Sequence, residues 1–147
     1  MTEVKIYTDG SCSGNPGPGG WAAVMIHGRH DREISGSERE TTNNRMELKA
    51  VVESLRALLK PCRAVIHTDS AYIANAFNDG WIKNWIKRGW KTASKKPVKN
   101  RDLCEDLLES METHDVKFVK VKGHADDELN NRVDELAVAA MNAGRYK

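Results

Sequence analysis

The sequence contains no apolar run long enough to cross a bilayer and no pair of cysteines in a CxxC pattern. It also lacks internal repeats, low-complexity tracts and an N-terminal apolar segment of the kind found in signal peptides. Its three cysteines, Cys12, Cys62 and Cys104, are odd in number and widely spaced. A zinc site or a disulfide framework is therefore poorly supported, and we expect reduced thiols in a cytoplasmic protein with no membrane association.

What remains is the composition of an ordinary globular protein. The chain has 147 residues, of which 39% are hydrophobic and 30% are charged. This length is sufficient for one domain with its own core, so we expect a single domain over residues 1–147.

The net charge of +2 conceals a strong asymmetry. Residues 81–101 contain eight basic side chains and no acidic one, whereas the rest of the chain has 15 basic and 21 acidic residues. A basic segment on an otherwise acidic domain is typical of a protein that binds a polyanion.

The pattern of apolar residues predicts an α/β fold, with a mixed sheet flanked by helices. A helical crossover between the first and fourth strands makes those strands parallel neighbours, whereas short links make the first three strands antiparallel. The glycine-rich stretch 14–20 is expected to be a loop. The expected strands are 4–8, 21–26, 32–37, 64–68 and 116–121, and the expected helices are 44–59, 70–77, 81–87, 103–111 and 131–143.

Four acidic residues stand where elements begin or end. Asp9 and Asp69 follow two strands that are expected to be adjacent, Glu47 borders the buried stripe of a helix, and Asp134 is expected to open the last helix. Taken singly, each has a structural explanation as a turn residue, a helix cap or a partner of the helix dipole. Taken together, they predict a cluster of like charges that two Mg²⁺ ions would neutralise, which indicates phosphoryl-transfer chemistry.

The motifs around these acids resemble those of the bacterial type 1 ribonuclease H family, in the family's order and over nearly the whole chain. The matching segments are Thr8-Asp9-Gly10-Ser11, Gly14 to Gly20, Thr41 to Glu47, Thr68-Asp69-Ser70, Arg88 to Thr92, Val121 to Ala125 and Asp134 to Ala137. The resemblance implies a ribonuclease H-like five-stranded sheet, with the fourth and fifth strands parallel to the first. It also implies a monomeric endoribonuclease that hydrolyses the RNA strand of RNA–DNA hybrids and leaves 5′-phosphate and 3′-hydroxyl ends.

The resemblance further assigns roles to individual residues. Asp9 would bridge two Mg²⁺ ions, for which Mn²⁺ is a possible substitute, and Asp69 would help to position the attacking water. Glu47 would lie near a ribose 2′-hydroxyl, and Asp134 would complete the second metal site. His124 would shuttle a proton or assist product release, although as a sequence feature alone it reads as an exposed loop histidine.

Substrate contacts are implied on both strands of the hybrid. Those near the cut strand are Cys12, Asn15, Asn43 and Asn44, although turn chemistry alone would explain Asn15. On the DNA side, Tyr72 and Trp81 would hold a sugar where a 2′-hydroxyl would clash, and Thr42 and Asn100 would hold a phosphate. The basic protrusion at about 81–101 would add Trp85, Lys87 and Arg88.

Two departures from the family's pattern put substrate affinity in doubt. Glu40 stands where many relatives place an arginine, and Ala71 stands where relatives often carry glutamine or methionine. Two other functions also stay open at this point, namely another nuclease or transferase of the same fold, such as an integrase-like domain, and a non-catalytic module that binds hybrids.

Overall fold

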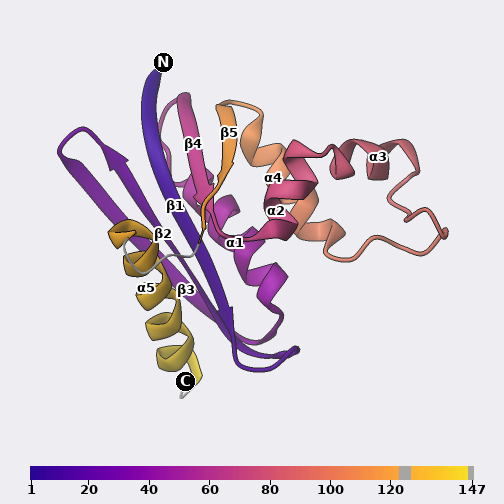
Figure 1. The fold of residues 1–147 in the computed structure, drawn as a ribbon, viewed down its shortest axis with the longest axis horizontal. Coiled ribbons are helices and arrows are strands. Elements are labelled where there is room, and N and C mark those ends of the chain that lie inside the picture. The colour runs from indigo at the N-terminus through magenta and orange to yellow at the C-terminus, as the bar shows by residue number, and fades with distance from the viewer. Residues whose placement is uncertain (123–126, 146–147) are drawn as a thin grey trace.

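The computed structural model describes residues 1–122 and 127–145 and contains five strands and five helices in that part of the chain (Figure 1). The strands are β1 (Thr2–Cys12), β2 (Gly17–His27), β3 (His30–Thr41), β4 (Cys62–Thr68) and β5 (Asp115–Lys120). The helices are α1 (Asn43–Arg56), α2 (Ala71–Asn78), α3 (Trp81–Lys87), α4 (Arg101–Met111) and α5 (Glu128–Arg145).

The strands form one sheet in the order β3-β2-β1-β4-β5. β1 pairs antiparallel with β2 and parallel with β4, and β4 pairs parallel with β5. The mixed sheet and the parallel pairing of the first and fourth strands, both expected from the sequence, are confirmed.

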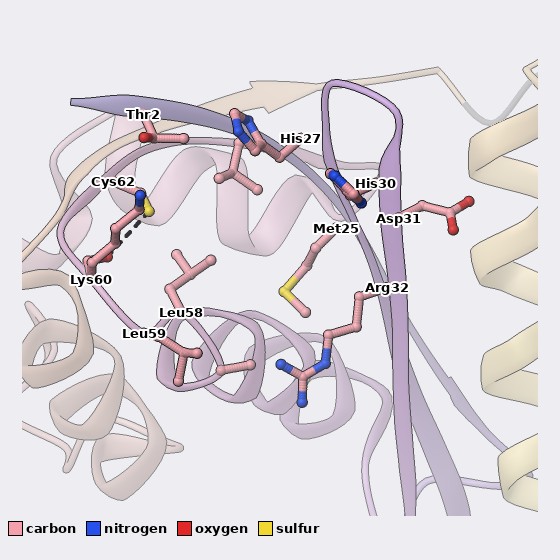
Figure 2. Close-up of a pocket in the computed structure, with 12 residues that line it drawn as sticks. Thr2, Met25, His27, His30, Asp31, Arg32, Leu58, Leu59, Lys60 and Cys62 are labelled. Atoms are coloured by element: carbon pink, nitrogen blue, oxygen red, sulfur yellow. Dashed lines mark hydrogen bonds between the residues drawn. The ribbon is translucent and has the colours of Figure 1, made fainter.

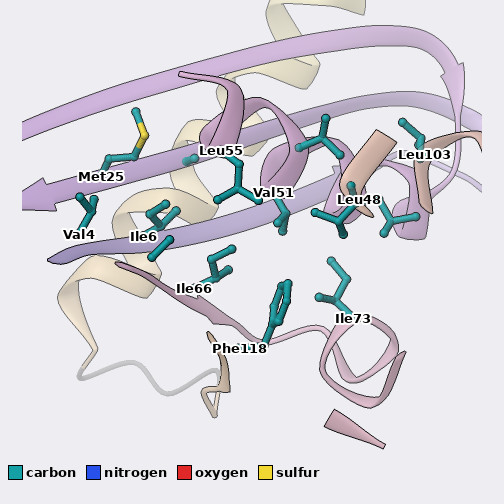
Figure 3. Close-up of a cluster of buried hydrophobic side chains, with 14 of the residues drawn as sticks. Val4, Ile6, Met25, Leu48, Val51, Leu55, Ile66, Ile73, Leu103 and Phe118 are labelled. Atoms are coloured by element: carbon teal, nitrogen blue, oxygen red, sulfur yellow. The ribbon is translucent and has the colours of Figure 1, made fainter. Parts of the chain in front are cut away.

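Helices cover the two faces of the sheet unequally. α1 packs on β1 and β2 and is itself backed by α4, whereas α5 lies across β1, β2 and β3 on the other face (Figure 1). The larger core lies under α1, where Leu48, Val51 and Leu55 meet Ile66 of β4 (Figure 3). Burying these side chains is the main driving force for docking α1 on the sheet.

The glycine-rich stretch is only partly a loop, contrary to the expectation. β2 begins at Gly17, and Gly17, Gly19 and Gly20 are all paired with β3 in the sheet. A Cβ atom on Gly20 would overlap the Ala137 carbonyl oxygen of α5. Glycine is thus required there for close helix packing, and composition alone cannot distinguish this use from a turn.

α1 begins and ends differently from the expected 44–59. The Thr42 hydroxyl accepts a hydrogen bond from the Arg45 amide at 3.3 Å and caps the helix, which ends at Arg56. Leu59 continues the apolar pattern in the sequence but is 98% exposed. The apolar pattern therefore predicts a helix that is three residues too long at its C-terminal end.

α5 is longer at both ends than the expected 131–143. The Asp127 carboxylate accepts a hydrogen bond from the Asn130 amide at 3.1 Å, and the helix begins at Glu128. Asp134 therefore lies in the second turn and does not open the helix. Gly144, expected as a stop, lies inside the helix, where a Cβ atom would overlap the Ser37 side chain.

Among the helices that the structure describes, none is both long and apolar enough to span a bilayer.

Candidate active site

Asp9 and Asp69 are brought together by the parallel pairing of β1 and β4. The ladder between these strands ends at the pair Tyr7–His67, and β4 ends at Thr68. β1 continues because β2 still pairs with it, with Asp9 opposite Ala22. Asp9 therefore lies within a strand, not at its end, just beyond the point where its neighbour strand stops and Asp69 follows.

Glu47 reaches these aspartates because α1 approaches β1 very closely. A Cβ atom on Gly10 would lie 2.5 Å from the Glu47 amide nitrogen, so the residue after Asp9 must be small. Glu47 is 3% exposed and Asp9 is 4% exposed. One carboxylate oxygen from each of Asp9, Glu47 and Asp69 lies within 4.8 Å of the others.

Asp134 completes the group from the opposite side of the sheet. It lines the same open hollow of about 570 Å³ as the other three acids, and its proximity helps to raise the pKa of Asp9. Its place in the second turn of α5 carries it to this hollow. The structure thus gathers the four sequence-predicted acids from two strand regions and two helices.

Burial and crowding raise the pKa values of the three clustered acids. Burial, followed by the hydrogen bond with Asp134, raises the pKa of Asp9 to about 7. Burial and the Asp9 charge raise the pKa of Glu47 well above its ordinary value, and burial with the Asp134 charge raises that of Asp69. These shifts show that the ionised cluster is costly without a positive counter-charge.

The donor set fits a hard divalent cation. The Glu47 Oε2 atom is buried and has no hydrogen-bond partner, so one strong acceptor stays unused inside the protein. All the ligand atoms that the cluster offers are carboxylate oxygens, the type that Mg²⁺ prefers. The four acids fit a metal site on their own chemistry and burial.

The residues expected near the cut strand lie beside the acids. Cys12, Asn43 and Asn44 line the same hollow, and the Asn15 side chain accepts a hydrogen bond from the Asn43 amide at 3.1 Å. The Cys12 thiol lies 2.8 Å from the Gly14 carbonyl oxygen, to which it donates. Cys12 therefore also fastens the glycine-rich segment at the edge of the hollow.

A second hollow of about 350 Å³ lies next to the first, and Tyr72 lines both. Trp85 shares this second hollow with Tyr72, whereas Trp81 is 38% exposed and stacks at a tilt against Trp85 with ring centroids 6.3 Å apart. Trp85 thus lies beside Tyr72 in this hollow, and the expected joint role of Tyr72 and Trp81 stays a prediction. The i, i+4 spacing of the tryptophans does not reveal which one turns inwards.

Thr42 and Asn100 both contact Arg45. Thr42 caps α1 through the Arg45 amide, and the Asn100 Oδ1 atom accepts a hydrogen bond from the Arg45 guanidinium at 3.4 Å. The same guanidinium makes a bidentate ion pair with Asp102, at 2.9 and 2.8 Å. Neither Arg45 nor Asp102 is expected as a site residue from the sequence, because no spacing links position 45 to position 102.

The basic segment extends away from the sheet, with α3 and the following loop at its outer part (Figure 1). Lys87 and Arg88 are exposed there, as is Glu40 on β3, whereas Ala71 lines the carboxylate hollow. His124 lies outside the described residues.

A separate, mainly apolar hollow of about 500 Å³ lies at the far end of the sheet, between the start of β1 and the β2–β3 turn (Figure 2). Met25, Leu58 and Leu59 contribute its apolar wall, and Lys60 and Arg32 lie at its edge. None of the expected site residues lines this hollow.

Comparison with known proteins gives a consistent set of relatives. The family model described as RNase H matches residues 1–142. A protein named Ribonuclease H from Symbiobacterium thermophilum is 55% identical over 144 residues, which is 98% of each chain. Another with this name from Moorella thermoacetica is 54% identical over 145 residues, covering 99% of this chain and 95% of the relative.

Solved structures show the same arrangement. LC9-RNase H1, described as a type 1 RNase H with the type 2 active-site motif, superposes with a TM-score of 0.87 at 33% identity, covering 97% of this chain and 74% of that one. LC11-RNase H1 in complex with an RNA/DNA hybrid superposes with a TM-score of 0.72 at 24% identity, over 96% and 98% of the two chains, and shows likeness of fold alone.

Proposed function

Because the chain belongs to the ribonuclease H family of metal-dependent hydrolases, we propose that it cuts the RNA strand of RNA–DNA hybrids through two Mg²⁺ ions, leaving 5′-phosphate and 3′-hydroxyl ends. The observation that carries this proposal is the group of Asp9, Glu47 and Asp69. One carboxylate oxygen from each lies within 4.8 Å of the others, and both Asp9 and Glu47 are buried. Asp134 borders the same hollow.

Asp9, Glu47, Asp69 and Asp134 would hold the ions. When bound, Mg²⁺ ions would supply charge neutralisation for the phosphate and lower the pKa of a water that attacks it. The raised pKa values of Asp9 and Glu47 support this role, because a cation is the partner that would let both stay ionised at neutral pH.

The residues around the acids would place the two strands. Cys12, Asn43 and Asn44 border the carboxylate hollow and would contact the RNA strand from its minor-groove side. Tyr72 and Trp85 would receive the DNA strand in the neighbouring hollow, where an aromatic surface favours a sugar without a 2′-hydroxyl. The hybrid bound in the LC11-RNase H1 complex supports this choice of substrate for a chain of the same fold.

The exposed cations of the basic segment would bind phosphates of the DNA strand. Lys87 and Arg88 lie on and just after α3, in a stretch that contains no acidic side chain. Such interactions strengthen binding without reading the base sequence. We therefore propose little base specificity.

Cleavage of matched substrates tests the proposal. The purified protein is incubated with a labelled RNA–DNA hybrid, the matching RNA duplex and the single-stranded RNA, each with Mg²⁺, Mn²⁺ or EDTA. We expect cutting of the hybrid's RNA alone, with metal only, and products that a ligase can rejoin through their 5′-phosphate. Hybrid binding without cutting under every metal condition would instead establish a binding module.

A further inference from the structure

Arg45 joins the two residues expected to hold a phosphate of the uncut strand. Its backbone amide donates to the Thr42 hydroxyl at 3.3 Å, and its guanidinium donates to Asn100 Oδ1 at 3.4 Å. Thr42 precedes α1 and Asn100 precedes α4, so these two residues come from different elements. Arg45 is therefore the described residue through which both of them are connected.

The guanidinium of Arg45 forms an ion pair with Asp102. Two hydrogen bonds of 2.9 and 2.8 Å make this a bidentate ion pair, and its side chains are 29% and 65% exposed. The Arg45 charge is thus matched by a carboxylate, and this arrangement suits a residue that orients others better than one that binds phosphate.

The conformation of Asn100 leaves its side chain available for Arg45. Its φ of 63° lies in the left-handed region, and although it precedes α4, its side chain makes no capping hydrogen bond. Asp102, in the first turn, accepts backbone hydrogen bonds at this end of the helix instead. Asn100 consequently places its Oδ1 atom against Arg45.

We propose that Arg45, locked by Asp102, is a positioning residue that fixes Asn100 and Thr42 as one phosphate-binding unit and couples it to the carboxylate hollow. The coupling is direct, because Arg45 lies on α1 between Asn44 and Glu47, which line that hollow, and Tyr72 lines both hollows. This inference rests on the proposed function, since it requires that an RNA–DNA hybrid is the substrate.

The test is a double-mutant cycle between Asp102→Asn and Asn100→Ala, read as KM and kcat on a hybrid. Asparagine keeps the shape and the acceptor oxygen of Asp102 but removes its charge. We expect Asp102→Asn to raise KM roughly 3- to 10-fold with a much smaller change in kcat, because a charge-assisted interaction is weakened. In the Asn100→Ala background the same change should have little further effect.

The slope of log KM against log salt concentration provides a readout that a merely destabilising change would not give. It should stay the same in Asp102→Asn, because no cation that binds phosphate is removed. Hybrids with a single neutral methylphosphonate moved along the DNA strand locate the phosphate. At one position of the DNA strand, the methylphosphonate should lower the affinity of the wild type for the hybrid. At the same position it should lower the affinity of the Asp102→Asn variant much less.

Asp106→Asn is the matched control, because it removes another ion pair between α4 and α1, with Arg56, and in the described part of the chain Asp106 pairs with neither Asn100 nor Arg45. It should leave KM unchanged. A KM that is unchanged or lowered in Asp102→Asn, or an equal effect with and without Asn100, would overturn the proposal. Failure of the wild type to cut hybrids at all would instead reject the proposed function, so the two failures are distinguishable.

Discussion

At the scale of single residues, the main feature is the unfavourable free energy of placing several acids close together inside the protein. Asp9 and Glu47 are almost fully buried, and Glu47 leaves one oxygen without a partner. Such groups reduce the stability of the metal-free fold, and the proposed metal ions would offset that cost.

Replacing Asp9 with asparagine should separate chemistry from stability. We expect Asp9→Asn to lower the cleavage rate by about 10³-fold or more, because a proposed metal ligand is removed. Hybrid binding should persist, and the metal-free variant should be more stable than wild type at pH 8 by about 1 to 3 kcal/mol, because a carboxylate with a raised pKa is removed. Urea unfolding in EDTA measures this difference, and equal or lower stability of the variant would contradict it.

The stability of the metal-free protein should depend on pH in an unusual direction. The pKa of Asp9 rises from 3.8 to about 7 on folding, so between these values the folded state binds more protons than the unfolded state. The free energy of unfolding should therefore fall as the pH rises through this window, by up to about 1.4 kcal/mol per pH unit. Thermal melts in EDTA test this, and saturating Mg²⁺ should remove most of the slope.

At the scale of elements, the site depends on how closely α5 approaches the sheet. Gly20 of β2 lies directly under the helix that carries Asp134, and a Cβ atom there would overlap the Met141 amide nitrogen. The helix must shift to accommodate any side chain at this position.

Gly20→Ala should therefore lower both stability and metal affinity. We expect a loss of about 2 to 4 kcal/mol in the free energy of unfolding, together with weaker Mg²⁺ binding, because α5 moves and takes Asp134 with it. Gly28→Ala is the matched control. Gly28 has a φ of 59° but nothing within 4 Å, so the change should cost only about 1 kcal/mol and leave Mg²⁺ binding unaltered by calorimetry.

Sequence patterns predict the order and type of these elements well because each depends on local periodicity. Burial follows the stripe of α1 from Leu48 to Leu55, and β2 is buried on both sides as its continuous apolar run indicates. The limits of the elements depend on distant interactions instead. α5 begins at Glu128, earlier than expected, and this places Asp134 in its second turn. Gly20 lies in a strand directly against α5, a contact that its local sequence does not indicate.

The choice of Trp85 over Trp81 beside Tyr72 has the same origin. Both tryptophans lie on α3, and only the packing of that helix on the core turns Trp85 inwards. The Arg45–Asp102 ion pair likewise joins residues 57 positions apart, and no local pattern indicates it.

At the scale of the whole molecule, charge is divided between two regions. Four acids lie in one hollow, and eight basic residues lie on a segment that extends from the sheet (Figure 1). This separation of unpaired acids from a basic segment suits the binding of a polyanion near the acids.

Removing the cations of the basic segment should weaken binding more than chemistry. In a variant with Lys87, Arg88 and Lys91 all replaced by alanine, we expect KM to rise at least about 10-fold while kcat changes little. The slope of log KM against log salt concentration should become shallower by roughly one for each phosphate that the variant no longer neutralises. Replacing Arg29, Arg63 and Lys117, which lie outside the segment, gives a control of equal charge, and a similar effect in that control would argue against a specific role for the segment.

The strand that carries Asp9 is the centre of the sheet, with β2 on one side and β4 on the other. Central strands open last in native-state hydrogen exchange, because every neighbour must separate before their amides meet solvent. The amides of Ile6 to Thr8 should accordingly exchange only through global unfolding. The protein would then keep Asp9, its proposed metal ligand, in place through any partial opening of α3 or of the edge strands, and the lifetime of the proposed active site would equal the lifetime of the fold.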